Sequence, residues 1–230
     1  MQRTPAVFGM TALALALGLG CSSPTPDPQV PRATPPSYSE STEAPHAETT
    51  EPSHASPTAA GLGSAPEDLR DLDWERTAVP GDFCDVPGRI TFTSGEAMAR
   101  SGTWGTVHAE HRPEDVVYGN VLGDSRVEAA LLVGCDTGGE TAGGRLAWAY
   151  LVFTSEEHEL RLVGTITPQQ YLGGHASAFE GIELASGRVT AHESWHRKND
   201  PTCCPSGKAV TTWNPGDDGT LEAGSQRITA

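Results

Sequence analysis

Residues 146–153 form an unbroken apolar run with the sequence Leu-Ala-Trp-Ala-Tyr-Leu-Val-Phe. A run of this length that is rich in aromatic and branched side chains, without polar alternation, is typical of a strand covered on both faces. A chain containing such a strand must place protein on two sides of one sheet. The run therefore predicts a β domain with a buried central strand.

Other segments have the shorter or alternating patterns of strands. Residues 160–167 alternate after a polar turn at 154–159, which predicts a hairpin partner for the central strand. Helical patterns are scarce, and only 66–72 and 95–100 are expected to form a turn or two of helix. The remaining predicted strands are 89–93, 116–118, 128–133, 182–184, 188–195, 208–213 and 220–223. The predicted fold class is mostly β, an antiparallel sandwich or half-barrel with one or two short helices.

The first twenty-one residues have the pattern of an export signal. After Arg3, residues 6–20 are uncharged and mostly apolar, a run shorter than the ~20 residues needed to span a bilayer. The run ends in LGLGC, whose last residue is Cys21, and Ser-Ser-Pro follows. This resembles a bacterial lipobox, in which the cysteine receives a diacylglycerol and becomes the new N-terminus. We expect 1–21 to be a lipoprotein signal peptide with Cys21 lipidated; a secretion signal with a chance cysteine is the alternative.

Residues 22–66 are predicted to be a disordered linker. These 45 residues contain ten Pro and fourteen Ser or Thr, and their large apolar side chains are Val30, Tyr38 and Leu62. Such a segment buries too little apolar surface to offset the entropy lost on ordering. The folded domain is therefore expected at 67–230, which is long enough for a single core.

The acidity of the chain excludes some partners. It has 15 Lys and Arg residues against 30 Asp and Glu residues, a formal net charge of −15. A field of that sign repels phosphate backbones, so we expect no nucleic-acid partner. The sequence contains no basic patch for docking on anionic lipid. The expected membrane contact is the lipid anchor on Cys21.

Four cysteines follow Cys21, namely Cys84, Cys135, Cys203 and Cys204. Export places them in an oxidising compartment, where an even number of cysteines indicates a disulfide framework. A bond between the adjacent Cys203 and Cys204 would close a very small ring. We therefore favour the two pairings that join them separately to Cys84 and Cys135. A zinc–thiolate cluster or a redox pair is the alternative, although no CxxC spacing supports it.

The segment HESWH at 192–196 matches the HExxH motif of zinc hydrolases. In that motif both histidines bind zinc and the glutamate is the base, which requires a helix to bring residues four apart onto one face. Residues 189–195 instead alternate like a strand, where positions four apart lie ~13 Å distant. Two zinc-bound nitrogens lie within about 4 Å of each other. We expect a strand without catalysis; a zinc-dependent hydrolase using His192, Glu193 and His196 is the alternative.

The segment GNVLGDSRVE at 119–128 resembles the calcium-binding GDLxGDGxxE loop of β-hairpin modules. Asn120, Asp124 and Glu128 stand where oxygen ligands are needed, but Leu122 also occupies such a position. We favour a tight turn between strands, with a calcium-stabilised binding module as the alternative. No cofactor is therefore expected, and zinc and calcium are kept as alternatives.

The chain resembles secreted lipoproteins of actinobacteria and is distantly similar to the LppP/LprE-type lipoproteins. The resemblance covers about 115–223. It is carried by the Cys21 leader with its Pro/Ser/Thr-rich linker, GNVLGDSRVE at 119–128, TAHESW at 190–195, NDPTCCPSG at 199–207 and TTW at 211–213. It implies an envelope lipoprotein and assigns no activity.

These patterns together predict a non-catalytic, disulfide-stapled β domain displayed on a lipid anchor. The expected location is the extracytoplasmic face of the cell membrane, with a secreted protein as the alternative. The expected partner is a component of the cell envelope. The zinc hydrolase and the calcium module remain the rival functions.

Overall fold

The computed structural model describes residues 61–139, 144–171 and 174–230. The predicted signal peptide, the predicted lipidation site Cys21 and most of the predicted linker lie outside these residues. All described residues belong to one compact unit of the chain. None of the helices among them is long and apolar enough to cross a membrane.

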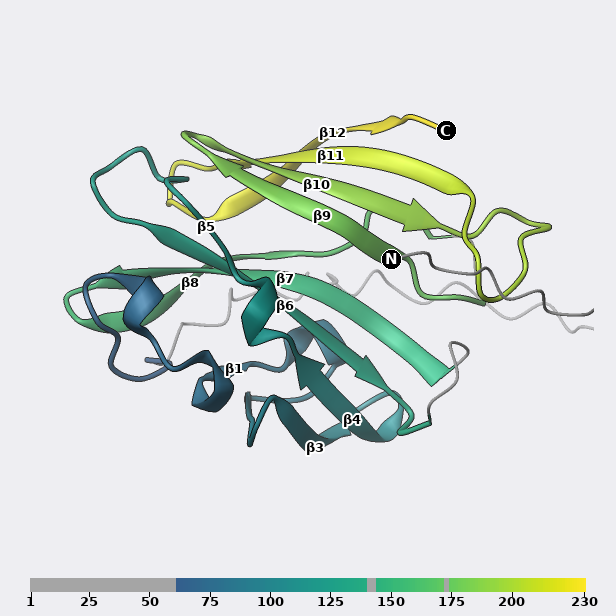
Figure 1. The fold of residues 1–230 in the computed structure, drawn as a ribbon, viewed down its shortest axis with the longest axis horizontal. Helices are drawn as coiled ribbons and strands as arrows, with labels where there is room; N and C mark the ends of the chain where they lie inside the picture. Colours follow the sequence, from purple (N-terminus) through teal and green to yellow (C-terminus); the bar gives the residue numbers. More distant parts are fainter. Residues whose placement is uncertain (1–60, 140–143, 172–173) are drawn as a thin grey trace, which may run out of the picture. The chain divides into compact units, whose positions relative to one another are not determined.

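The described residues form strands and single-turn 3-10 helices, in the order that Figure 1 shows. The strands are β1 (Ala78–Pro80), β2 (Arg89–Thr91), β3 (Glu96–Ser101), β4 (Gly105–His111), β5 (Val117–Gly119), β6 (Glu128–Asp136), β7 (Arg145–Glu156), β8 (Glu159–Ile166), β9 (Ala178–Ala185), β10 (Arg188–Trp195), β11 (Gly207–Pro215) and β12 (Leu221–Ile228). The helical turns are η1 (Leu69–Asp71), η2 (Trp74–Arg76), η3 (Asp82–Cys84) and η4 (Pro113–Asp115). The fold is mostly antiparallel β, as predicted.

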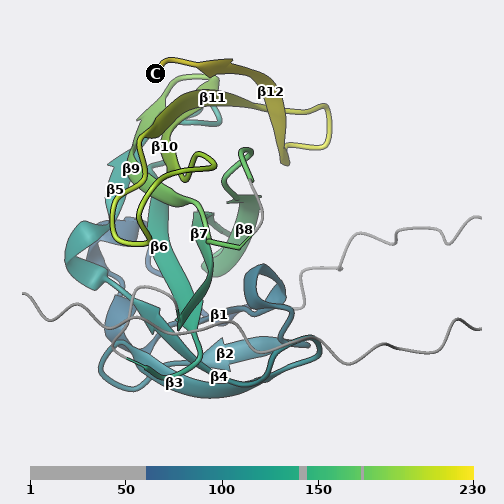
Figure 2. The same cartoon turned by 90° about the vertical axis from the view of Figure 1, so that its right-hand side faces the viewer.

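The strands form three antiparallel sheets. The larger sheet has the order β3-β4-β6-β7-β8, and β5 also pairs with β6. The second sheet has the order β12-β11-β10-β9, and β1 pairs with β2 in a small sheet. In Figures 1 and 2 the four-stranded sheet lies over one face of β6 and β7, and the N-terminal elements lie toward the other face. The central strand is therefore covered on both sides.

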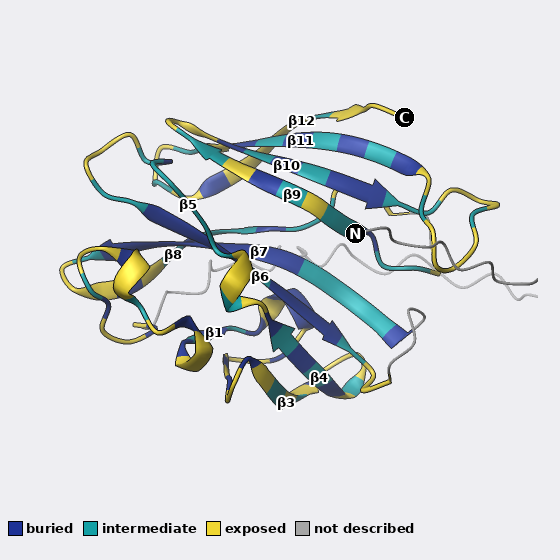
Figure 3. Cartoon of the chain, in the orientation of Figure 1, coloured by how far each residue is buried: buried dark blue, intermediate teal, exposed yellow. Residues whose placement is uncertain are grey.

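The predicted central strand is β7, and it separates two apolar cores. Tyr150 and Val152 face the four-stranded sheet, in a cluster that also contains Trp213. Leu151 and Phe153 belong to the other core, with the N-terminal elements. Figure 3 shows β6 mostly buried and β7 buried over 149–155 after a partly buried start, whereas β10 and β11 alternate. This burial on both faces is the reason that β7 has no polar alternation.

All nine strands predicted from the sequence are present, as β2 and β5–β12. The helix predicted at 95–100 is wrong, because these residues form β3 and pair with β4. The reversal that begins β3 uses Ser94 and Gly95, whose φ angles are 54° and 83°. Thr93 donates its N–H to the Glu96 carbonyl across this turn at 2.9 Å. Sheet pairing therefore overrides the helix propensity of the Glu-Ala-Met-Ala segment.

Residues 61–66, which were predicted to belong to the linker, are part of the folded domain. Leu62 and Ala65 are buried in the core under the larger sheet. The Ala65 N–H donates to the His158 carbonyl at 2.8 Å, and the Leu160 N–H donates to the Gly63 carbonyl at 2.9 Å. These contacts with the β7–β8 hairpin show that the folded domain includes residues 61–66.

The cysteine pairing differs from the prediction, because Cys84 joins Cys135 and Cys203 joins Cys204. Cys84 ends η3 and Cys135 lies on β6, with both side chains buried in one core and their Cα atoms 6.3 Å apart. Cys203 and Cys204 are exposed in the loop between β10 and β11. The Cys84–Cys135 bond lies in the core of the larger sheet, whereas the Cys203–Cys204 bond lies in a loop of the four-stranded sheet. This separation excludes the predicted bonds that would join Cys203 and Cys204 to Cys84 and Cys135.

His111, at the end of β4, is a buried histidine with a relative exposure of 5%. Its ring packs edge-on against Phe92, with centroids 4.4 Å apart. Neither ring nitrogen has a hydrogen-bond partner among the described residues. Burial lowers the pKa of His111, and the backbone of Glu75 together with the charges of Glu114 and Glu75 offsets this only in part. The folded protein therefore favours the neutral imidazole.

We expect the domain to lose stability as the pH falls through about 6.5, the pKa of an unperturbed histidine. Below this pH the unfolded chain binds a proton at His111 that the folded state takes up less readily, so the stabilisation present at higher pH is lost. Thermal unfolding followed between about pH 8 and pH 5 measures the effect. His111→Phe should flatten the profile, and the exposed-site control His158→Asn should retain it. An unchanged profile in His111→Phe would contradict the assignment.

Candidate functional site

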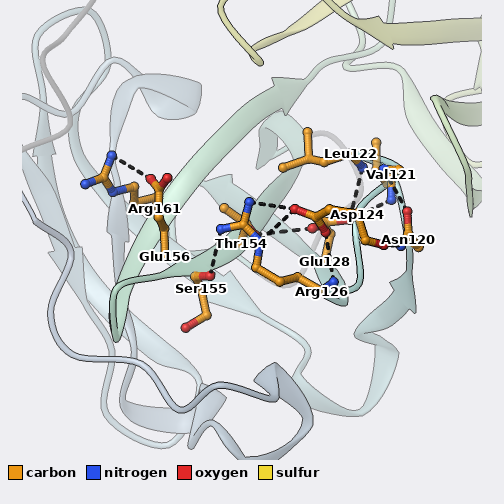
Figure 4. Close-up of polar contacts among 11 residues, drawn as sticks. Asn120, Val121, Leu122, Asp124, Arg126, Glu128, Thr154, Ser155, Glu156 and Arg161 are labelled. Carbon is orange, nitrogen blue, oxygen red and sulfur yellow. Dashed lines mark hydrogen bonds and ion pairs between the residues drawn. The ribbon is translucent and has the colours of Figure 1, made fainter.

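Glu128, the first residue of β6, is a fully buried carboxylate that organises the loop at 119–128. Its Oε2 accepts the backbone N–H groups of Val121 and Leu122 at 2.6 and 3.2 Å. Its Oε1 accepts the hydroxyl of Thr154 on β7 at 3.2 Å. Figure 4 shows the carboxylate enclosed by these donors. Glu128 therefore satisfies backbone groups that the loop would otherwise leave unpaired.

The other two predicted calcium ligands also have protein partners. Asn120 accepts the Gly123 N–H at 2.8 Å and donates its side-chain amide to the Asp124 carbonyl. The Asp124 carboxylate forms an ion pair with Arg126 at 2.6 Å, and hydrogen bonds from Arg126 lower the pKa of Asp124. The oxygens that a calcium ion would need are thus occupied by donors of the loop itself. This arrangement favours the predicted tight turn between strands over the alternative of a calcium-binding loop.

The HESWH segment lies mainly on β10, which pairs with β9 and β11 along its length. His192 is on the outer face, 3.6 Å from a carboxylate oxygen of Glu183. His196 follows the last strand residue, and its Nε2 lies 3.0 Å from the Thr202 carbonyl. An extended chain separates residues four apart by ~13 Å. His192 and His196 therefore cannot share the zinc ion that the hydrolase alternative requires.

Glu193 points the opposite way, into the space between the sheets, and is fully buried. Its Oε1 accepts the Thr211 hydroxyl at 2.6 Å. Its Oε2 accepts the Gln169 N–H at 2.8 Å, the Gln170 N–H at 3.3 Å and the Gln226 side-chain amide at 3.2 Å. The backbone donors belong to the segment that crosses from the larger sheet to β9. Glu193 therefore holds this crossover segment against β10, and both of its carboxylate oxygens accept hydrogen bonds from the protein.

Across the part of the chain that the structure describes, no group of three or more His, Cys, Asp or Glu side chains is arranged to hold a metal ion. The two sequence motifs therefore supply buried structural carboxylates, Glu128 and Glu193. Each accepts two consecutive backbone N–H groups and a threonine hydroxyl from a neighbouring strand. Both carboxylates are thus occupied by hydrogen-bond donors of the protein.

A cleft of about 450 Å³ opens at the side of the domain, between β9 and the η4–β5 segment. Its apolar lining residues are Val116, Val117, Leu132, Tyr150, Phe179 and Ile182, and its charged ones are Arg112, Glu114, Asp115 and Glu180. At one end β5 and β9 pack closely, because a Cβ on Gly119 would lie 2.5 Å from the Leu184 Cβ. The volume is in the range of small-molecule sites.

Tyr150 supplies a hydroxyl to the lining of this cleft. Its side chain has a relative exposure of 5%, and its ring packs against Phe179 with centroids 5.0 Å apart. Among the described residues the hydroxyl has no hydrogen-bond partner, and it is not one of the fully buried unpartnered polar atoms, so it is open to the cleft. Burial, together with the charge of Asp115, raises the pKa of the Tyr150 phenol. The group therefore stays protonated and is available to donate to a ligand.

The charged residues around the cleft set its preference for ligands. Arg112 forms an ion pair with Asp115 at 3.7 Å, and Lys208 forms one with Glu180. Both cations are thus neutralised by carboxylates, and Glu114 adds a further negative charge. Together with the acidity of the whole chain, this disfavours anionic ligands.

The sequence patterns did not identify this cleft, although one signal was present. Tyr150 carries the single hydroxyl of the apolar run at 146–153. A tyrosine in a strand buried on both faces needs either a partner or an opening for its hydroxyl.

Comparison of the chain with protein-family models, with curated proteins and with solved structures gives no match.

Proposed function

We propose that this chain is a cell-envelope lipoprotein whose β domain binds an envelope component without chemically changing it. The leader ending in Cys21 and the Pro/Ser/Thr-rich segment after it support the location. In this proposal a lipid on Cys21 anchors the chain at the extracytoplasmic face of the membrane. In this proposal residues 22–60 form a flexible segment of 39 residues with a root-mean-square span of ~31–37 Å, enough to hold the domain away from the membrane.

The unpartnered Tyr150 hydroxyl in the cleft is the observation that carries the proposed binding function. The hydroxyl is not among the fully buried polar atoms that lack a partner, so it is open to the cleft and free to exchange a solvent contact for a hydrogen bond to a ligand. The ring of Phe179 packs against the Tyr150 ring and offers an apolar surface in the same cleft. The negative rim disfavours anions. These features suit an uncharged ligand with both hydroxyls and an apolar face, which is the chemistry of a wall saccharide.

We expect Tyr150→Phe to weaken binding of the full-length chain to purified cell-wall sacculi by about three- to tenfold, the value of one neutral hydrogen bond. Its stability should remain close to that of the wild type, because the hydroxyl has no protein partner to lose. Cosedimentation with sacculi of an actinobacterium measures the affinity, and thermal unfolding measures the stability.

The matched control for this substitution is Tyr171→Phe, which removes the hydroxyl of a side chain with 70% exposure. It should leave binding unchanged. Phe179→Ala, which removes the ring beside Tyr150, should weaken binding at least as much as Tyr150→Phe. Equal affinity of Tyr150→Phe and the wild type, or no saturable binding to sacculi, would contradict the proposal.

A further inference from the structure

Two histidines from distant parts of the chain meet at one end of the four-stranded sheet. His175 precedes β9 and His196 directly follows β10. Because β9 and β10 are antiparallel neighbours, the start of one strand lies beside the end of the other. The two imidazole rings lie with their centroids 4.6 Å apart and their planes inclined by 39°.

The loop after β10 selects the tautomer of His196. Its Nε2 lies 3.0 Å from the backbone carbonyl of Thr202, and a carbonyl can only accept. Nε2 therefore carries the hydrogen, and Nδ1 carries a lone pair. Nδ1 is buried and has no hydrogen-bond partner among the described residues. A histidine that donates one N–H to a carbonyl and presents the other nitrogen as a lone pair has the arrangement of a metal ligand.

The Thr202 carbonyl is itself held in place. The Cys204 N–H donates to the Pro201 carbonyl at 2.9 Å, which closes a turn around Thr202. Asp200 closes the base of the loop, because it accepts the backbone N–H groups of Arg197 and Ser206 at 2.8 and 2.7 Å. The acceptor that orients His196 thus belongs to an ordered loop, which is the kind of support that metal ligands use.

The local charge is compatible with a cation. Asp200 adds a negative charge to the loop that holds His196, since hydrogen bonds from the backbone of Arg197 and Ser206 lower the pKa of its carboxyl. The guanidinium of the neighbouring Arg197 stacks over the Trp195 ring at 5.8 Å. The net charge of −15 raises the local concentration of cations around the whole chain.

From these contacts we propose that His175 and His196 form a site for one divalent transition-metal ion, with two imidazole nitrogens as its protein ligands. Imidazole ligands suit copper, zinc and nickel rather than calcium or magnesium. Because the described residues contain no group of three metal-binding side chains, water fills the other coordination positions and the ion exchanges readily. The site is separate from the Tyr150 cleft and does not depend on its ligand.

Cu²⁺ is the probe for this site, because it binds nitrogen ligands most tightly among the divalent first-row ions. The full-length oxidised chain, carrying His46→Ala and His54→Ala to remove the linker histidines, should bind one Cu²⁺. Pulsed electron paramagnetic resonance should detect two coordinated imidazoles. His175→Ala and His196→Ala should each weaken Cu²⁺ binding at least about tenfold and leave one imidazole signal.

Two control variants separate this site from its alternatives. His192→Ala, in the same HESWH segment but on the outer face, should leave Cu²⁺ binding unchanged. The double variant Cys203→Ser/Cys204→Ser should also bind, because the thiols are not ligands in this proposal. Loss of binding in either control with retention in His175→Ala would overturn the proposal, as would a spectrum with fewer than two imidazoles in the parent chain.

Discussion

Replacing Cys84 and Cys135 together with alanine should lower the free energy of unfolding by about 4 kcal/mol, the entropy of a cross-link that closes a loop of some fifty residues. The two cysteines are 51 residues apart in the sequence. Their bond ties η3 to β6 inside a core that contains both side chains. The same replacement at Cys203 and Cys204 should change stability by less than about 1 kcal/mol, because a bond between neighbours restricts the unfolded chain very little.

Denaturation of the oxidised double variants in urea measures this contrast, with the wild type as reference. Both double variants should fold, since each retains one native bond. If the cysteines of the loop were instead joined to Cys84 and Cys135, each double variant would lose both bonds. The two would then be destabilised equally, which would contradict the structure. Peptide mapping under non-reducing conditions identifies the pairs independently.

Replacing Glu193 with alanine should destabilise the domain by about 3–5 kcal/mol, because it leaves several buried donors without an acceptor and opens a cavity. The donors include the N–H groups of Gln169 and Gln170, which begin the crossover to β9. Glu193→Gln should cost much less. Its amide oxygen still accepts the backbone donors, and its amide N–H₂ can donate to the Thr211 hydroxyl.

The matched control is Glu183→Ala, on the neighbouring strand β9, whose side chain is 74% exposed. It should change the free energy of unfolding by no more than about 0.5 kcal/mol. Thermal and denaturant unfolding of the three variants measure the series. A hydrolytic glutamate would behave differently, because Glu193→Gln would then leave stability intact and abolish an activity. Equal stability of Glu193→Ala and Glu183→Ala would contradict the structural role.

The strands were predictable because their signals are local. The apolar run at 146–153 specifies a strand covered on both faces, and β7 is buried in this way. The alternation at 188–195 indicated a strand, and β10 follows it. Where local propensity and pairing disagreed, pairing prevailed, since β3 forms from a segment with helical composition.

The roles of Glu128, Glu193 and His196 were harder to predict from the sequence. Both motif glutamates have the residue type of a ligand or base, but burial and backbone donors make them structural. The backbone N–H groups lie 6 to 24 positions from the glutamates that accept them, so no motif based on residue spacing predicts these hydrogen bonds. His196 similarly lies beside His175, from which the whole β9–β10 hairpin separates it in the sequence, and not beside its motif partner His192.

The sequence by itself determined nine of the twelve described strands, the buried central strand and the strand conformation of the HESWH segment, because periodicity and side-chain type act over a few residues. It missed β1, β3 and β4. The tertiary structure decided the cysteine pairs, the cleft at Tyr150 and the meeting of His175 with His196. Each depends on which layers and strand ends come together, and burial of the two apolar faces of β7 is what brings these layers together.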